Sequence, residues 1–345
     1  DQKFYRLINR YSFEHEDFPF QIDLSIVRES TKKQNNLKES SIFNLPEKYE
    51  IEIEVNNKLI DDKMTPELLD KMLKKVTKYI LSGLQGTNYP VSYLEQKHTL
   101  KEYLQLFNGS KYREGDEENI QPKDFIGPSS TTLQLSNITP TNKDSSLVNI
   151  RSNYTVTDKA DGDRKMLYVS NKGKIYMITT LMEIEFTGCE TNTREMFNSL
   201  LDGEHIKYNK QGDFINLYAA FDIYYINNKD IREFEFTPEN SDKIKTQFRL
   251  PLLSSFITNL KAVLINTKTT PPMSIRSKNF RQTTDDQSLF QMCKLLQNKI
   301  IADEYPYETD GFIFTPSNIG VGVNMKGEKP KNYKNTWNHS LKWKP

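Results

Sequence analysis

A short charged segment near the middle of the chain offers a candidate nucleophile. Lys159 is followed by Asp161, Gly162 and Arg164, and apolar runs typical of strands stand on both sides. A lysine amine attacks a phosphate only in its uncharged form, so its surroundings must favour loss of a proton. The flanking runs predict that Lys159 lies at a strand end that opens into a cleft. The alternative interpretation is a charged hairpin turn with Asp-Gly at its tip.

Further charged groups downstream suit the same chemistry. Arg164 is a planar donor for phosphate or ribose oxygens, and Glu204, which follows Asp202 and Gly203, can accept hydrogen bonds from sugar hydroxyls. Asp310 offers carboxylate oxygens to magnesium, which binds through few carboxylates and takes other ligands from substrate phosphates. These residue types indicate a site that transfers a nucleotide.

The last positive charges of the chain fall on a strand-like run. Lys342 and Lys344 alternate, so both point to one face, where they can stabilise charge on an attacked phosphate and on the leaving pyrophosphate. Phe221 is a candidate to stack on a base, with core packing as the alternative role. Cys189, Cys293 and the four histidines show no metal-binding spacing and are interpreted as structural.

The elements that must position these residues are mostly strands. Alternating or apolar runs predict strands at 131–135, 154–158, 164–169, 174–179, 216–226, 311–314 and 341–343. Short helices are expected near 193–201, 252–264 and 285–299, and a polar loop at 108–124. Strand runs interleaved with helices, without regular alternation, predict an α+β fold of mainly antiparallel sheets with flanking helices.

The first 57 residues contain two alternating strand patterns, 18–27 and 49–55. Glu50, Glu52 and Glu54 share one face of the second pattern. Neighbouring carboxylates repel, so this face is expected either to bind cations or to face solvent as an acidic edge strand.

One helix is predicted between these strands and the candidate site. Thr65 suits the N-cap, Pro66 the first helical position, and Gly86 the C-terminal end. The helix is interpreted as a packing element or a connector. Its expected buried stripe consists of Leu69, Met72, Leu73, Val76, Ile80 and Leu84.

Composition sets broad limits. A chain of 345 residues is expected to form two domains, and 47 basic against 46 acidic residues give no argument for nonspecific nucleic-acid binding. No apolar run is long enough to span a membrane, and no signal peptide is visible. Two cysteines indicate reduced thiols in an intracellular protein.

The charged segments resemble motifs I, III, IIIa, IV and V of the covalent nucleotidyltransferase superfamily, in order, over about residues 125–345. That superfamily holds DNA ligases, RNA ligases and mRNA capping guanylyltransferases. The resemblance implies a lysyl–nucleoside monophosphate intermediate, release of pyrophosphate, and Mg²⁺ or Mn²⁺. It makes Lys159 the nucleophile and assigns the ribose to Arg164 and Glu204. By the same resemblance, Asp310 would bind the metal, and Lys342 and Lys344 would bind the phosphates.

The residues that occupy the motif positions favour the capping guanylyltransferases. An ATP-dependent RNA or DNA ligase is the alternative. The segments 125–128, 309–316 and 341–345 resemble the capping form. The strands around Asp23 and Glu50 resemble the late strands of tunnel-type RNA 5′-triphosphatases, which capping enzymes of large DNA viruses carry ahead of the guanylyltransferase. Glu52 and Glu54 would then be metal ligands.

The resemblance also implies an organisation and partners. Residues 1–60 are expected to end a β-barrel triphosphatase module, 61–124 to connect, and 125–345 to form the guanylyltransferase. The chain is expected to be a piece of a longer protein, and this piece is expected to lack the oligonucleotide-binding domain that the family carries after motif V. GTP and the RNA 5′ end are the expected substrates. A methyltransferase and a viral RNA polymerase are expected partners, and the expected location is cytoplasmic, in a viral factory or virion.

Overall fold

The computed structural model describes residues 2–140, 147–238, 247–264, 272–283 and 288–345. The chain divides into two compact units, Asp1–Thr87 and Asn88–Pro345. The expected connector at 61–124 therefore does not stand apart, because its first helix belongs to one unit and its remainder to the other. The functional division into a triphosphatase part and a transferase part stays a prediction. None of the described helices combines the length and the apolarity that crossing a bilayer requires.

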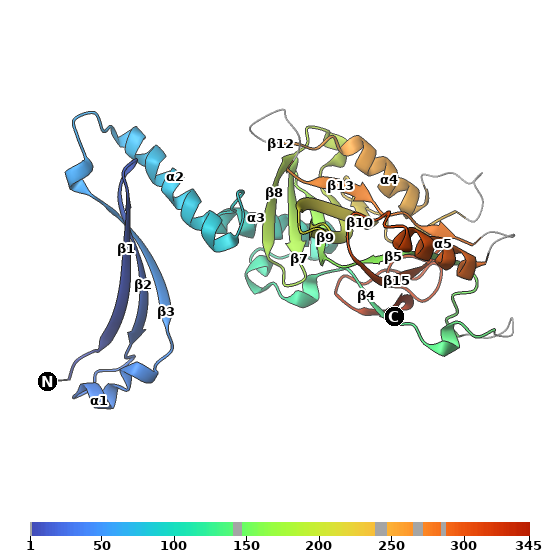
Figure 1. Ribbon diagram of the computed structural model, residues 1–345, viewed down its shortest axis with the longest axis horizontal. Helices are drawn as coiled ribbons and strands as arrows, with labels where there is room; N and C mark the ends of the chain where they lie inside the picture. The colour runs from blue at the N-terminus through green and yellow to red at the C-terminus, as the bar shows by residue number, and fades with distance from the viewer. Residues whose placement is uncertain (1, 141–146, 239–246, 265–271, 284–287) are drawn as a thin grey trace. The chain divides into compact units, whose positions relative to one another are not determined.

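The first unit contains a long curved antiparallel sheet (Figure 1). Its register places Glu50, Glu52 and Glu54 opposite Ser25, Asp23 and Gln21, on one polar face. In the described residues of this unit the sheet is open, with three strands in the order β1-β2-β3, and not a closed barrel. The strands are β1 (Arg6–His15), β2 (Phe18–Glu29) and β3 (Lys48–Val55).

Helix α2 (Pro66–Gln85) begins and ends as predicted. The Thr65 hydroxyl accepts from the backbone N–H of Leu68, and Gly86 ends the helix with a φ of 62°. The predicted buried stripe is wrong for most of its length, since only Val76 is buried and Leu84 is 67% exposed. Within the described residues of the first unit, the helix contacts β2 at its first residue, where the Phe18 ring lies edge-on to the ring of Tyr79 in the helix.

The second unit contains two sheets in its described residues. The larger has eight strands in the order β11-β10-β9-β6-β7-β8-β12, with β13 paired in parallel to β10. Its strands are β6 (Asp163–Val169), β7 (Lys174–Thr179), β8 (Ile184–Glu190), β9 (Ser199–Tyr208), β10 (Phe214–Ile226), β11 (Lys229–Asp230), β12 (Val263–Leu264) and β13 (Ser274–Ser277).

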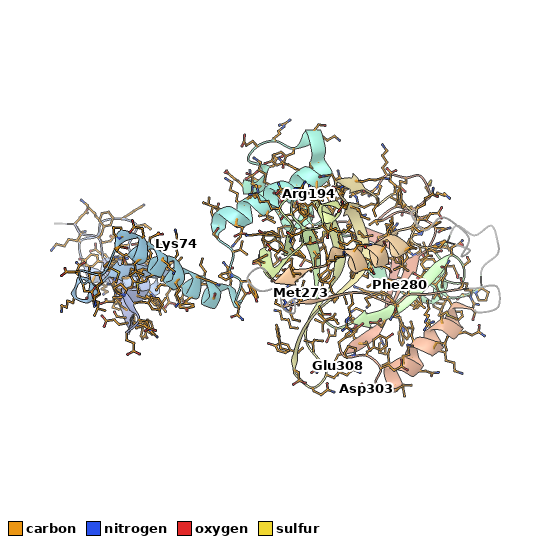
Figure 2. The ribbon with its side chains drawn as sticks, turned by 90° about the horizontal axis from the view of Figure 1, so that it is seen from above. Lys74, Arg194, Met273, Phe280, Asp303 and Glu308 are labelled. Atoms are coloured by element: carbon orange, nitrogen blue, oxygen red, sulfur yellow. The ribbon has the colours of Figure 1, made fainter. Side chains whose placement is uncertain are left out.

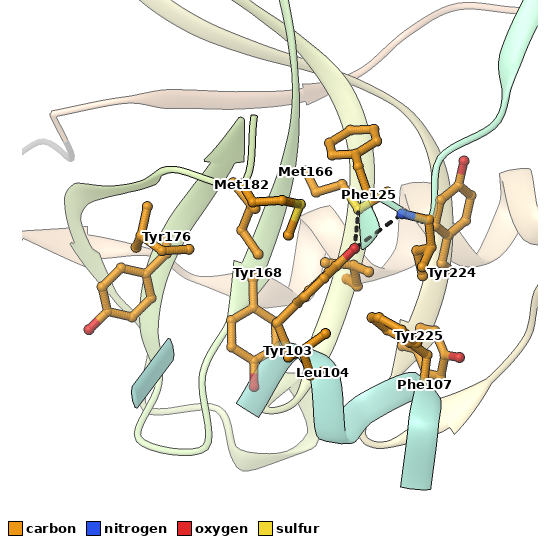
Figure 3. Close-up of a cluster of buried hydrophobic side chains, with 14 of the residues drawn as sticks. Tyr103, Leu104, Phe107, Phe125, Met166, Tyr168, Tyr176, Met182, Tyr224 and Tyr225 are labelled. Carbon is orange, nitrogen blue, oxygen red and sulfur yellow. Dashed lines mark hydrogen bonds between the residues drawn. The ribbon is translucent and has the colours of Figure 1, made fainter. Parts of the chain in front are cut away.

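Both faces of the larger sheet are covered, which explains the unbroken apolar run of β6. Met166 and Tyr168 pack with side chains of α3 (Tyr93–Asn108). Leu167 and Val169, which point the other way, pack with α4 (Arg249–Leu260). Figure 3 shows the first of these clusters, in which the hydroxyl of Tyr103 accepts from the backbone N–H of Ile126 at 3.2 Å.

The smaller sheet has five strands, in the order β14-β5-β15-β16-β4. Val156, Phe312 and Leu341 on one face pack with apolar side chains of α5 (Leu289–Ile301). The opposite face carries Thr157 and Lys159 and is left for the candidate site. The strands are β4 (Ser129–Thr132), β5 (Tyr154–Ala160), β14 (Arg281–Gln282), β15 (Thr309–Pro316) and β16 (Thr336–Trp343).

The α+β prediction is confirmed, as are most of the predicted strands. The helix predicted at 193–201 is wrong, because only a single 3-10 turn forms before β9 begins. Helix α3 and strands β8 and β9 were not predicted, and the supposed loop 108–124 contains short turns. The helix predicted at 285–299 has its first residues outside the described part. The short helices are α1 (Leu37–Ser40), η1 (Ile42–Asn44), η2 (Asn57–Leu59), η3 (Gly109–Lys111), η4 (Asp116–Asn119), η5 (Pro122–Asp124), η6 (Leu135–Asn137) and η7 (Arg194–Met196).

Candidate active site

The Asp161-Gly162 segment is the link by which the chain passes from one sheet to the other. It joins β5 to β6, and these strands pair with other strands and not with each other, so the hairpin interpretation is wrong. Glycine is required at 162, since a Cβ there would lie 2.9 Å from Glu204 Cγ and 2.9 Å from the carbonyl oxygen of His205. This link places Lys159 near the end of β5 in the smaller sheet and Arg164 near the start of β6 in the larger sheet.

Lys159 is held by a carboxylate on the neighbouring strand. Its Nζ donates to Oδ1 of Asp310 at 2.6 Å, and Nζ of Lys344 lies 2.6 Å from Oδ2 of the same residue. The side chain of Lys159 is 21% exposed, so it is not turned to bulk solvent. The ladder between β5 and β15 is irregular between Thr309 and Phe312, and this irregularity lets Asp310 reach the lysine.

A cavity of about 280 Å³ lies between the facing sides of the two sheets. It brings together Lys159, Arg164, Glu204, Phe221 and Lys342, which the sequence had placed in one site. Phe221 occupies a register shift in β10, between Ala220 and Asp222, which turns its ring into the cavity. The other lining residues are Pro128, Ser129, Ser130, Thr157, Ala160, Asp222, Tyr224, Lys278, Phe280, Ile313, Thr315, Trp337 and Ser340.

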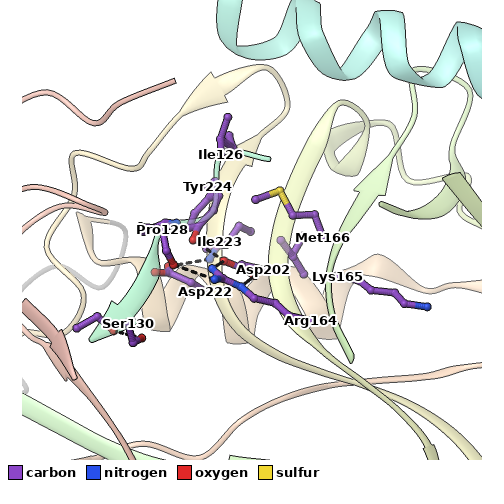
Figure 4. Close-up of polar contacts among 12 residues, drawn as sticks. Ile126, Pro128, Ser130, Arg164, Lys165, Met166, Asp202, Asp222, Ile223 and Tyr224 are labelled. Atoms are coloured by element: carbon purple, nitrogen blue, oxygen red, sulfur yellow. Dashed lines mark hydrogen bonds and ion pairs between the residues drawn. The ribbon is translucent and has the colours of Figure 1, made fainter. Parts of the chain in front are cut away.

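Arg164 is fixed in this cavity by a buried carboxylate (Figure 4). Its Nε donates to Oδ1 of Asp202 at 3.0 Å and its NH2 group donates to Oδ2 at 2.5 Å. Asp202 is fully buried and also accepts from the hydroxyl of Tyr224 at 2.5 Å. The guanidinium carbon lies 5.5 Å from the ring centre of Phe125 and 5.6 Å from that of Phe221. The plane of Arg164 is therefore set before any ligand arrives.

Glu204 lies directly opposite Arg164 in the β6–β9 ladder. Burial raises its pKa to about 7, despite the opposing attraction of Lys278, Arg164 and Lys159. At neutral pH this carboxyl is thus close to its midpoint of ionisation. A hydroxyl ligand can then meet either an acceptor or a donor at this position.

The pKa of Asp310 shifts in the opposite direction to that of Glu204. Partial burial acts to raise its pKa, but hydrogen bonds from Lys159 and Lys344 prevail and hold the pKa below its ordinary value. The carboxylate is therefore ionised at neutral pH. A charged oxygen ligand beside Lys159 fits Mg²⁺ or Mn²⁺, since such ions take few protein ligands when phosphates supply the rest.

Five residues predicted for this site do not line the cavity, namely Asp161, Gly162, Asp202, Asp310 and Lys344. Lys344 follows β16, is 57% exposed, and is joined to the site by its ion pair with Asp310. Asp161 lies in the exposed link, where its backbone N–H donates to the carbonyl of Glu308 at 2.9 Å. Asp202 was predicted near the site, and the structure makes it the support of Arg164.

Sequence reasoning missed a buried lysine. Lys278 lines the cavity, is 8% exposed, and its Nζ lies 2.9 Å from Oδ2 of Asp158. The hydroxyl of Tyr307 donates to the same carboxylate oxygen at 3.1 Å. Asp158 was visible beside Lys159, but its partners are more than 100 positions away. No local pattern could have paired them.

A buried ion pair below the cavity was also missed. Nε of Arg249 donates to Oδ1 of Asp222 at 2.8 Å, and neither side chain is more than 7% exposed. The pair ties the first turn of α4 to β10 next to Phe221. The aspartate was visible in the sequence beside Phe221, but the arginine lay in an apolar helix without distinguishing neighbours.

The polar face of the first unit is a second candidate site. Arg10 donates to Oδ2 of Asp23 at 3.0 Å and to Oε2 of Glu52 at 2.9 Å, while Arg6 donates to Oε2 of Glu50 at 2.5 Å. Within the described residues, no three His, Cys, Asp or Glu side chains are placed to hold a metal ion. The described part of this face thus does not form a metal centre by itself, and the assignment of Glu52 and Glu54 to a metal stays a prediction.

A lysine amine, a fixed arginine and a second lysine converge between two sheets with separate helical covers, and this arrangement defines a nucleotidyltransferase catalytic domain. The family model described as mRNA capping enzyme, catalytic domain, matches residues 128–345. The chain belongs to that family.

A similar protein is named "Probable mRNA-capping enzyme" and comes from Acanthamoeba polyphaga mimivirus. It is 24% identical over 381 residues, which take in 99% of this chain. The chain spans only 28% of the length of that relative.

Proposed function

We propose that the second unit is an mRNA guanylyltransferase that uses Lys159 as its nucleophile. The observation that carries this proposal is the convergence of Lys159, Arg164, Glu204 and Lys342 on one cavity, with Asp310 bound to the lysine. The family membership and the mimivirus relative support GTP as the nucleotide. A nucleotidyl transfer needs positioning and charge stabilisation more than acid–base chemistry, and the buried cations supply both.

The proposed reaction has two steps. In the first, Nζ of Lys159 forms a bond to the α-phosphorus of GTP, the bond from that phosphorus to the bridging oxygen breaks, and pyrophosphate leaves with the electron pair. The amine proton passes to solvent. In the second, a terminal oxygen of an RNA 5′-diphosphate attacks the same phosphorus, the P–N bond breaks, and the lysine regains its amine. Arg164 and Glu204 hold the ribose, and Phe221 lies beside the base.

Asp310 and the phosphates of the nucleotide would hold Mg²⁺ or Mn²⁺. The bound ion would supply positive charge that neutralises the phosphate oxygens. Lys342 adds charge from the cavity wall, and Lys344 adds charge from its position on Asp310. Because Asp310 hydrogen-bonds Lys159 in the protein alone, it keeps the amine beside the place where the α-phosphate must lie.

Radiolabel transfer tests the proposal. The full-length protein incubated with [α-³²P]GTP should acquire a covalent label that survives denaturing electrophoresis, and Lys159→Ala should lose it completely. The matched control is Lys172→Ala, in an exposed turn of the same unit, which should label like the wild type. Persistent labelling of Lys159→Ala would refute the nucleophile assignment. Labelling by ATP in place of GTP would select a ligase.

A second activity is favoured by the polar face of the first unit. We propose that this face belongs to an RNA 5′-triphosphatase, because Arg6, Arg10 and the row Glu50, Glu52 and Glu54 are suited to phosphate and cation binding. Phosphate release from triphosphate-ended RNA by the full-length protein, and its loss in Glu52→Gln with labelling at Lys159 kept, would support this assignment. Equal release by the variant would contradict it.

The wider setting follows from the proposed activity. A capped product requires an RNA 5′ end as acceptor, and cap methylation requires a methyltransferase domain or subunit. A viral RNA polymerase and a cytoplasmic viral factory or virion are the proposed partner and location. Copurification of these components with the full-length protein from infected cells is the measurement that checks them.

A further inference from the structure

A second cavity, of about 220 Å³, lies on the other side of strand β5 from the reactive lysine. Asp158 lines it, while Lys159 lines the nucleotide cavity, because consecutive strand residues point to opposite faces. The walls come from β13, the end of α5 and the segment Glu304–Tyr307, which lies between the labelled Asp303 and Glu308 (Figure 2). Lys278 is shared by the two cavities.

The basic side chains that line this cavity outnumber the acidic ones. Four basic and two acidic side chains take part, and both acids already have partners. Asp158 is bound by Lys278 and Tyr307, and Glu304 lies 3.0 Å from Nζ of Lys299. The remaining charge is positive, so the cavity is suited to an anion.

Two arginines supply that remaining charge, and both are exposed. Among the residues that the structure describes, Arg276 donates only its Nε, to the hydroxyl of Ser274 at 3.2 Å, which leaves the end of its guanidinium fork for a ligand. Within the described residues, the guanidinium of Arg281 forms no hydrogen bond or ion pair. Arginine forks match phosphate groups with two parallel hydrogen bonds.

Most of the remaining lining is apolar or aromatic, which suits a nucleotide better than a bare phosphate. The rings of Tyr305 and Tyr307 lie 5.7 Å apart at an angle of 54°. Leu217, Ala219, Leu296 and Pro306 add apolar surface, and Ser277 and Asn279 add two polar groups. Cations beside aromatic rings are the combination with which proteins hold single-stranded nucleic acid, since the cations contact the backbone and the rings stack on bases.

Resting on the proposed function, we propose that this cavity binds the acceptor RNA, with a phosphodiester on Arg276 and Arg281 and a base beside Tyr305. An RNA whose first phosphates approach Lys159 passes the edge of the smaller sheet, where β14 contributes only Arg281 and Gln282. The nucleotides that follow the 5′ end then meet the second cavity. The site acts on the transfer step and not on the loading of GMP.

The test separates acceptors by length in the full-length protein. The double variant Arg276→Gln, Arg281→Gln and the wild type are first loaded with GMP, and transfer is then measured to ADP and to a diphosphate-ended oligonucleotide. ADP has no following nucleotide, so its KM should be unchanged. The KM of the oligonucleotide should rise about tenfold, with a weaker dependence on salt, because two phosphate contacts are lost. Arg194→Gln, an exposed arginine elsewhere in the unit, is the matched control.

Two results would overturn the inference. One is an oligonucleotide KM equal to that of the wild type, and the other is an equal rise for ADP and the oligonucleotide. Binding of a fluorescent, diphosphate-ended oligonucleotide is measured in parallel. If the wild type takes no label from GTP, the proposed function fails. The cavity is then judged by binding alone, which the double variant must still weaken relative to Arg194→Gln.

Discussion

One ion pair on the polar face of the first unit and one pair beside the cavity of the second unit differ in their exposure to water. In the first unit, Arg6 and Glu50 have side chains 44% and 33% exposed, whereas in the second unit Arg249 and Asp222 are 0% and 7% exposed. Water and salt screen the first kind of pair, so its geometry is only weakly enforced. Burial makes the second kind costly to disturb, because a charge left alone cannot recover its hydration. The comparison teaches that the second unit has its site arranged in advance.

Asp23 in the first unit and Glu204 in the second unit have pKa shifts in opposite directions. In the first unit the pKa of Asp23 is lowered, by hydrogen bonds from Ser12 and Gln21 and by Arg10. In the cavity of the second unit, burial raises the pKa of Glu204. The partners of Asp23 thus stabilise its charged form, while burial in the cavity destabilises charge on Glu204 until a ligand compensates it.

The largest effect that tests this comparison is expected when the arginine of one ion pair is removed in each unit. Arg249→Ala should lower the free energy of unfolding of the second unit by about 3–5 kcal/mol, because Asp222 is left buried without its partner. Both tryptophans lie in that unit, so urea unfolding followed by their fluorescence measures it directly. Arg6→Ala should produce only a small change in hydrogen exchange of β1–β3. Hydrogen exchange is measured for both variants. A loss of exchange protection in β1–β3 after Arg6→Ala as large as the loss in the second unit after Arg249→Ala would contradict the comparison.

A smaller effect is expected when the buried support of Arg164 loses its charge but not its shape. Asp202→Asn should lower kcat/KM for enzyme–GMP formation about 100-fold, because the guanidinium is no longer fixed by a charged acceptor. The measurement is the rate of labelling over a range of GTP concentrations. Asp163→Asn, whose side chain is 65% exposed and 3.9 Å from Lys207, is the matched control and should leave the rate unchanged. Similar rates in the two variants would show that burial of the pair does not matter.

The smallest expected effect is a change in pH dependence. The pKa of Glu204 rises from an ordinary 4.5 to about 7 on folding. Its contribution to stability is therefore fully present below pH 4.5 and is lost as pH rises through about 7. Glu204→Gln should remove this decline. Its stability relative to the wild type should therefore increase as pH rises through that window.

The same substitution also tests nucleotide binding. Ionised Glu204 accepts hydrogen bonds from ribose hydroxyls, so the KM for GTP should fall as pH rises through about 7 in the wild type. The variant should show a flatter profile. The difference between the two profiles isolates Glu204 from other titrating groups. Parallel profiles for the wild type and the variant would mean that this carboxyl does not titrate in the cavity.

Much of the catalytic unit was predictable because its determinants are local. The strand at Lys174–Thr179 has its predicted bounds. Strand alternation predicted that Lys342 and Lys344 share one face, and in the structure Lys342 lines the cavity with Lys159. The helix at Thr193 was mispredicted because a short mixed segment carries no clear period. The stripe of α2 failed for another reason. An amphipathic pattern shows which side could be buried, but not whether a partner covers it.

Residue type and spacing along the chain were sufficient to identify Lys159 as the candidate nucleophile, to order the groups expected to serve it and to predict the α+β class. These are properties of neighbouring residues, and strand alternation transmits them directly into space. Only the tertiary structure decided that Asp161-Gly162 joins two sheets, that Asp202 fixes Arg164, and that Lys278 neutralises Asp158. Those contacts join residues far apart in sequence, and burial, which no local pattern encodes, gives them their strength.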